Sequence, residues 1–171
     1  MLDLNLEHLL TYTDWERQKW RDLFHQRGDD GLKISIGPHG DGRFQTVGDL
    51  IRHIFSAEKR YVERLSGRPL SDTGIVPTDK SESLFQFGEQ TRKDFKKFIA
   101  TFPAEDWDKP QEFKIANSSL TATPRKIVLH TVLHEIRHWA QVATQLRCNG
   151  LVGDFHDFLF NPVLGGELKR G

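Results

Sequence analysis

Residues 130–141 read HTVLHEIRHWAQ, and they carry the most informative pattern in the chain. Three histidines, His130, His134 and His138, lie four residues apart in a run with the apolar period of a helix. Positions four apart lie one above the other on one face of a helix. His134 and His138 can therefore direct two imidazoles at one point, and Gln141 falls on the same face. Neutral imidazole nitrogen is a ligand for zinc, nickel, copper or iron.

The simpler alternative is that these histidines lie on the helix surface and bind nothing. Three histidines on one face, beside an apolar face, make that alternative weaker than a ligand role. A pair of imidazoles also needs a third ligand. His53 lies at the border of an apolar stripe in another predicted helix, one turn before the small residue Ala57. Alone, His53 would be explained as an interfacial histidine. Beside a pair that needs a third donor, it is the best candidate.

The composition limits the classes of function. A chain of 171 residues is long enough for one domain with a substantial core. Lysine plus arginine equals aspartate plus glutamate at 24 each, which predicts binding to neither nucleic acid nor an anionic membrane. Cys148 is the only cysteine, which excludes an internal disulfide and fits a reducing compartment. With no apolar run near 18 residues and no leader, we expect a soluble, cytoplasmic protein.

Apolar residues at three- and four-residue steps predict four long helices, at residues 2–27, 46–65, 81–102 and 124–147. Thr46, Asp79 and Thr123 are predicted to cap the N-termini of the second, third and fourth helices, and Gly28 is predicted to end the first. For the last helix, the apolar face is predicted to comprise Leu129, Val132, Leu133, Ile136, Ala140 and Ala143.

The connections complete the expected fold. Residues 68–80 are too long for a tight return and permit a crossover. Residues 112–121 predict a short β-hairpin between the third and fourth helices, and residues 154–160 a short C-terminal helix. The fold class is therefore all-α, a four-helix bundle forming one domain over residues 1–164, with a loose tail at 165–171.

The chain resembles the DinB-like (damage-inducible) family of four-helix metal-binding proteins over nearly its whole length. The resemblance rests on an ordered set of residues, namely Tyr12 and Trp15, His53, the entry Leu120–Arg125, His130, His134, His138 and Gln141, and the late Asp157–Phe160. It implies an up-down-down-up bundle with a metal triad of His53, His134 and His138. Around that triad or in its pocket it implies His130, Gln141, Trp15 and Tyr12. The common family form has Arg-Gly where this chain has Trp139-Ala140, a difference that leaves the ligands intact.

The same resemblance implies an activity. Characterised relatives include metal-dependent transferases that use low-molecular-weight thiols, together with isomerases and hydrolases. We therefore expect one divalent ion, zinc or nickel, that activates water or a thiol toward a small-molecule substrate. A homodimer is also implied, and Phe85 and Trp107 are taken as exposed aromatic residues that favour it.

Two alternatives remain from the sequence. The motif from His134 to His138 also satisfies H-E-x-x-H, the pattern of zinc peptidases in which Glu135 would be the catalytic base. The further histidine of one large peptidase group is absent, and no strand set precedes the helix. In the other alternative, the metal only braces a non-catalytic bundle or interaction protein.

Overall fold

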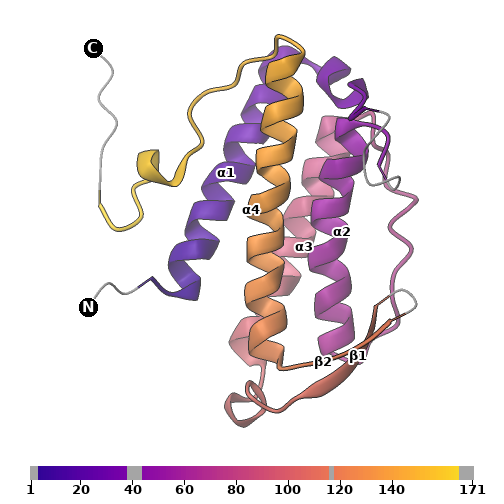
Figure 1. Ribbon diagram of the computed structural model, residues 1–171, viewed down its shortest axis with the longest axis vertical. Helices are drawn as coiled ribbons and strands as arrows, with labels where there is room; N and C mark the ends of the chain where they lie inside the picture. Colours follow the sequence, from indigo (N-terminus) through magenta and orange to yellow (C-terminus); the bar gives the residue numbers. More distant parts are fainter. Residues whose placement is uncertain (1–3, 38–43, 116–117, 166–171) are drawn as a thin grey trace.

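The computed structural model describes residues 4–37, 44–115 and 118–165, and it confirms a mostly helical fold. Its four long helices are α1 (Leu6–Arg27), α2 (Val47–Leu65), α3 (Ser81–Thr101) and α4 (Pro124–Cys148). They pack together as a bundle (Figure 1). An antiparallel hairpin of β1 (Gln111–Ile115) and β2 (Ser118–Ala122) joins α3 to α4. Three 3-10 segments complete the elements, at η1 (Asp29–Lys33), η2 (Ala104–Asp106) and η3 (Phe158–Phe160).

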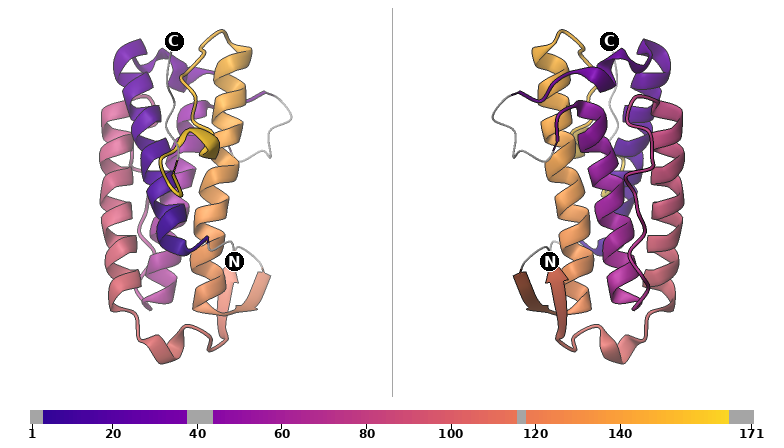
Figure 2. Two further views of the ribbon diagram at one scale, coloured as in Figure 1. Left: turned by 90° about the vertical axis from the view of Figure 1, so that its left-hand side faces the viewer. Right: turned by 90° about the vertical axis from the view of Figure 1, so that its right-hand side faces the viewer.

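The hairpin lies at one end of the bundle, beside the start of α4 (Figure 2). Residues 38–43, residues 116–117 and most of the predicted C-terminal tail, from residue 166 on, lie outside the described residues. Among the described helices, none combines the length and the apolar character that crossing a membrane requires.

The connection between α2 and α3 returns along the whole length of α2. Part-way along, Arg60 Nη2 donates a hydrogen bond to Thr73 Oγ1 at 3.1 Å. At the beginning of α2, the carbonyl oxygen of Thr78 lies 1.9 Å from the place a Cβ on Gly48 would occupy, so only glycine fits there. The chain therefore enters α3 beside the start of α2, and these two helices run in the same direction (Figure 1). This is the predicted up-down-down-up course.

Local signals determine where three of the helices begin or end. Thr46 and Asp49 form the predicted capping box, in which each side chain accepts a hydrogen bond from the backbone N–H of the other. Thr123 caps α4 with a proline directly after it. At the end of α1, Gly28 adopts a φ of 79° and its N–H donates to the carbonyl of Phe24. These residues satisfy backbone groups that a helix end leaves without partners.

The start of α3 corrects the prediction that Asp79 caps this helix. The N-cap position is Lys80, and its side chain makes no capping hydrogen bond. Instead, Asp29 Oδ1 accepts hydrogen bonds from the backbone N and the Oγ of Ser81, at 3.0 and 2.6 Å. The capping carboxylate thus comes from η1, 52 positions earlier in the chain, where a local motif cannot reveal it.

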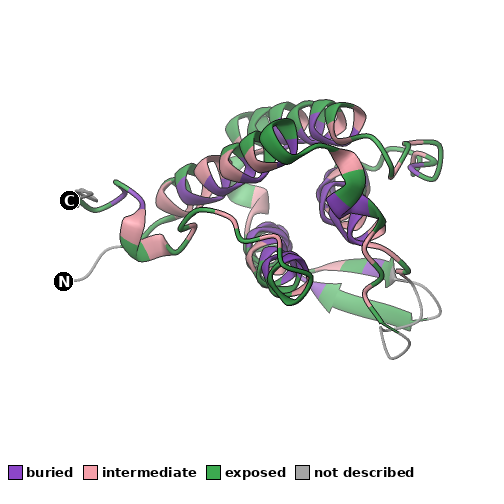
Figure 3. Ribbon diagram, turned by 90° about the horizontal axis from the view of Figure 1, so that it is seen from above, coloured by how far each residue is buried: buried purple, intermediate pink, exposed green. Residues whose placement is uncertain are grey.

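The core lies on the inward faces of all four helices, as the view along the bundle shows (Figure 3). Its largest fully buried side chain is Trp139, stacked on Trp20 and Phe85 with ring centroids 5.8 and 6.4 Å apart. Phe85 is only 4% exposed, so the prediction that it is a surface aromatic residue is wrong. Trp107 is half-buried against Phe98 and Phe102. Neither residue therefore supports a dimer, which stays a prediction.

The buried face of α4 agrees with the predicted one at Val132 and Ala143 but is otherwise rotated from it. Leu129 and Leu133 are 38% and 57% exposed, and Ala140 is also exposed. The helix turns Trp139 and the charged Glu135 into the bundle instead. Counting apolar residues alone misplaced the face, because a buried carboxylate occupies a position that the pattern assigned to the surface.

The segment after α4 is an extended strap and not the predicted short helix. Within residues 149–165, the part of this segment that the structure describes, the helical part is the three-residue η3. The strap folds back beside α1 (Figure 1), where Tyr12 Oη donates to the carbonyl of His156 at 3.1 Å. The Tyr12 and Phe158 rings also meet edge to face, with centroids 5.2 Å apart. Phe155 and Leu159 are 57% and 80% exposed, so the apolar residues of this segment do not form the buried face that would stabilise a helix.

Candidate metal centre

Three histidines from two neighbouring helices come together on one side of the bundle. His53 comes from the middle of α2, and His134 and His138 come from α4. The Nε2 atom of His134 lies 3.0 Å from the Nε2 atoms of both His53 and His138. One ligand atom from each residue can be chosen so that all three lie within 4.8 Å of one another. The trio predicted from the sequence therefore forms a cluster that could hold a metal ion.

The dimensions of the cluster fit a small divalent ion. Tetrahedral coordination with bonds of about 2.0–2.1 Å separates ligand nitrogens by about 3.3 Å. The two separations from His134, 3.0 Å to His53 and 3.0 Å to His138, need only a few tenths of an ångström of opening to reach that value, and one ligand atom from each of the three residues lies within 4.8 Å of the others. Burial, followed by the neighbouring His138 and His53, lowers the pKa of His134 from 6.5 to about 3. His134 is therefore neutral near pH 7, which is the form that binds a metal.

Gln141 fixes the orientation of one imidazole. Its Oε1 lies 2.5 Å from Nδ1 of His138. A carbonyl oxygen can only accept a hydrogen bond, so Nδ1 carries the proton and donates it. In the neutral ring, Nε2 then presents its lone pair to the cluster. When an imidazole binds a metal through one nitrogen, a hydrogen bond from its other nitrogen fixes the tautomer and the orientation of the ring.

Phe44 forms an apolar wall beside the cluster, and the sequence interpretation missed it. Its ring centroid lies 4.4 Å from that of His53 and 6.4 Å from that of His138. Backbone hydrogen bonds place it there, from Val47 N to Ile34 O at 2.9 Å and from Ile36 N to Gln45 O at 3.1 Å. The available signal was a single aromatic residue in a polar, glycine-rich loop, two positions before the cap of α2.

Comparison with known proteins agrees with this architecture. The model of the DinB family matches residues 1–164. The chain belongs to the DinB family. No curated protein matches its sequence. This match confirms the family resemblance found in the sequence. The histidine cluster of this DinB protein is formed by the three residues that the resemblance implied as metal ligands.

His130 of the DinB protein stays outside the cluster, as its position one turn earlier predicts. It is exposed, and its ring centroid lies 5.6 Å from that of His134 and 5.5 Å from that of Tyr61. Desolvation of its ring by the neighbouring side chains, followed by the charge of Arg137, lowers the pKa of His130. Its place at the edge makes it a neighbour of the cluster.

Glu135 lies between His134 and His138 in the sequence, but its side chain contacts two arginines and not the histidine cluster. Arg17 donates to its carboxylate through Nε and Nη2 at 2.5 and 2.9 Å, and Arg92 Nη2 donates at 2.5 Å. Trp139 Nε1 adds a fourth hydrogen bond at 3.0 Å. Burial raises the pKa of Glu135, but the charges of Arg17 and Arg92 outweigh it and lower the pKa overall. Such a carboxylate is a poor base, and its oxygens are already occupied.

Tyr12 and Trp15, expected around the metal, lie where the strap meets α1. Tyr12 bonds the strap, and the ring of Trp15 lies 6.1 Å from that of Tyr12. Lys19 packs its ammonium group 4.8 Å above the Trp15 ring. In this DinB protein, Tyr12 therefore anchors the C-terminal strap, and Trp15 packs beside it on α1.

Proposed function

We propose that this DinB protein binds one divalent ion through His53, His134 and His138, and that the ion activates water or a low-molecular-weight thiol toward a small-molecule substrate. The observation that carries the proposal is the convergence of three imidazole nitrogens, one with its proton fixed by Gln141. Zinc or nickel is the proposed metal, because both accept neutral imidazole ligands. A cytoplasmic location, where such thiols are reduced, belongs to the same proposal.

Each residue of the site has a defined task in this proposal. The three histidines contribute no charge, so a bound ion keeps its full charge and lowers the pKa of water or a thiol in an open position. Gln141 holds His138 in the tautomer that can bind. Phe44 covers one side of His53 and limits access of water from that direction.

The peptidase alternative is weaker on this geometry. It requires Glu135 to accept a proton from water beside the metal. The hydrogen bonds from Arg17 and Arg92 engage both carboxylate oxygens, and the residue is 2% exposed. A metal that only braces α2 against α4 remains the non-catalytic alternative, and experiment separates it from the proposal.

Metal content is the first test. Protein purified without a histidine tag should contain about one equivalent of zinc or nickel by elemental analysis. His53→Ala should lose most of it, because two imidazoles on one helix hold zinc weakly against water. His130→Ala is the matched control and should keep it. Equal metal content in His53→Ala and the parent protein would overturn the assigned site.

Thiol binding is the second test, and it distinguishes activation from bracing. Cobalt-substituted protein should develop a sulfur-to-metal charge-transfer band when titrated with cysteine or glutathione. The spectrum should not change with serine, which has an oxygen in place of the sulfur. A spectrum unaffected by either thiol would contradict thiol activation while leaving the metal site intact.

A further inference from the structure

The C-terminal strap lies along α1 and runs antiparallel to it (Figure 2). From the start of the strap toward its end, the contacts pair Gly153 with Leu23, Asp154 with Lys19, His156 with Glu16 and Phe158 with Tyr12. The partners on α1 are three or four residues apart, so they form one stripe on that helix. The strap is therefore held on α1 in a fixed register.

A carboxylate and an imidazole meet at the centre of this contact. Glu16 is 2% exposed, and its Oε1 lies 3.2 Å from Nδ1 of His156. A proton between these two atoms can be carried by either residue. The other carboxylate oxygen, Oε2, is buried and has no hydrogen-bond partner among the residues that the structure describes. Glu16 therefore relies on the strap to satisfy its carboxyl group.

We propose that the strap is a pH-dependent latch, which stays on α1 while the Glu16–His156 pair holds a proton and is released as the pH rises and that proton is lost. A carboxylate that is buried without a cation carries a large desolvation cost. Release of the strap exposes Glu16 to water and removes that cost. The latch is separate from the metal centre, and it does not depend on the function proposed above.

The groups around Glu16 leave its negative charge poorly compensated. From α4, Glu135 contributes a second negative charge that acts on it. On α1 itself, the neighbours on the same face are the uncharged Tyr12 and Trp20. The strap adds Asp157, since burial, the charge of Glu16 and then the charge of Asp157 raise the pKa of Tyr12. A charged Glu16 beneath the docked strap is therefore unfavourable.

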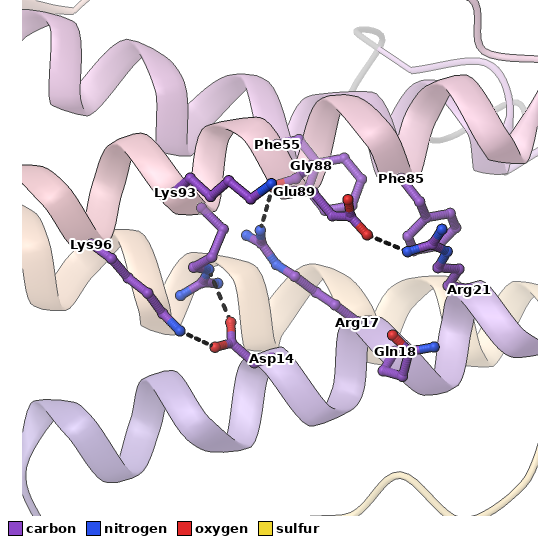
Figure 4. A pocket seen from close by; sticks show the side chains of 11 residues that line it. Asp14, Arg17, Gln18, Arg21, Phe55, Phe85, Gly88, Glu89, Lys93 and Lys96 are labelled. Carbon is purple, nitrogen blue, oxygen red and sulfur yellow. Dashed lines mark hydrogen bonds and ion pairs between the residues drawn. The ribbon is translucent and has the colours of Figure 1, made fainter.

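Arg17, the next residue on α1, does not supply the missing cation. Figure 4 shows its side chain directed toward α3, where Nη1 donates to the carbonyl of Gly88 at 3.0 Å. Its Nε and Nη2 donate to Glu135 and Glu58. Within the described part of the chain, the cationic group that contacts Glu16 is therefore the imidazole of the strap.

Rising pH, and not falling pH, should release the strap. With the strap docked, burial raises the pKa of Glu16 above its ordinary 4.5, and the lowering by His156 offsets this only in part. With the strap released, Glu16 is exposed and its pKa returns toward the ordinary value. Docking is therefore strongest below pH 4.5 and weakens as the pH rises through the raised pKa. Within that window, each pH unit changes the docking equilibrium by up to about tenfold.

The latch reaches α4 through stacked aromatic rings. The ring of His156 lies 4.8 Å from that of Trp20, which stacks on Trp139 at 5.8 Å. Trp139 directly follows His138 in the sequence of α4. Trp20 is only 3% exposed with the strap in place. Release would therefore uncover the outer end of a stack whose inner end belongs to the helix that carries two metal ligands.

Backbone order in the strap tests the latch. ¹⁵N relaxation would be measured on zinc-loaded, full-length protein at about pH 5.5 and about pH 8.5, below and above the expected release. The order parameters of His156 and Phe158 should be about 0.85 at the lower pH and below about 0.6 at the higher pH. Glu16→Gln, which is neutral at both pH values, should keep the strap ordered at both. Glu7→Gln is the control, because Glu7 is exposed on the same helix, and it should respond as the parent does.

A second measurement needs no variant. The carboxyl carbon of Glu16, followed by ¹³C NMR in the parent protein, should titrate above pH 4.5. Titration at or below that value would overturn the proposal. So would a parent strap equally ordered at both pH values, or the same loss of order in Glu16→Gln as in the parent. Loss of zinc at the lower pH would not mimic the expected result, because it would affect the parent and both variants alike.

Discussion

Replacing Glu135 by glutamine tests whether this carboxylate holds the fold together or serves the metal. The change keeps the shape of the side chain and removes one negative charge. Arg17 and Arg92, 8% and 6% exposed, would then keep two positive charges in the core, with Glu58 as their one remaining buried carboxylate. The new amide would also point N–H groups at guanidinium N–H groups. Removing one partner of a buried ion pair costs about 3–5 kcal/mol.

In a chain of this size, 1 kcal/mol corresponds to a change in Tm of about 2–4 °C, so Glu135→Gln should lower Tm by roughly 6–20 °C. Thermal and urea unfolding would measure the loss, and elemental analysis of the folded variant would measure how far the lost contacts loosen the metal ligands on α4. Glu105→Gln is the control, because Glu105 is exposed in η2, and its Tm should stay within about 2 °C. The reasoning would be refuted by a Glu135→Gln protein of parental Tm that has lost metal or turnover.

Three further predictions follow from single contacts. Because the pKa of His134 is lowered from 6.5 to about 3, the unfolded chain binds a proton in that window that the folded chain does not. The metal-free protein should therefore lose stability as the pH falls from 6.5 toward 3, seen as a falling urea midpoint. Gln141→Leu should weaken metal binding about 10–100-fold in a chelator competition, and unchanged affinity would mean that the tautomer is fixed otherwise. Asp29→Ala should reduce the free energy of unfolding by about 1 kcal/mol through lost capping of Ser81, and Asp79→Ala should change it much less.

The histidine cluster was predictable because its information is local. An i, i+4 pair on a helix defines a point in space without reference to the rest of the chain. The third ligand needed only a histidine at the border of another apolar stripe, which His53 provides. The helix starts at Thr46 and Thr123 were likewise readable from a few neighbouring residues.

What the sequence did not reveal depends on residues that are distant along the chain. The cap of α3 comes from Asp29, and the aromatic wall of the cluster comes from Phe44 in a loop. Glu135 could not be assigned from its motif, because its partners lie 118 and 43 positions away. Periodicity counts apolar residues, so it also could not anticipate a charged side chain on the buried face of α4.

The buried charges and the histidines are linked through the geometry of one helix. Successive residues of an α-helix point about 100° apart, so a helix that directs Glu135 at Arg17 and Arg92 directs its neighbour His134 elsewhere. In α4 that other direction faces α2 and His53. An apolar contact could slide or rotate by a fraction of a turn at little cost, whereas hydrogen bonds from two arginines to one carboxylate tolerate little rotation. Buried ion pairs add little net stability over well-packed apolar residues, so their value here lies in specificity. On this reasoning, the ion pairs in the centre of the bundle set the rotation of α4, and with it the direction in which the metal ligands point.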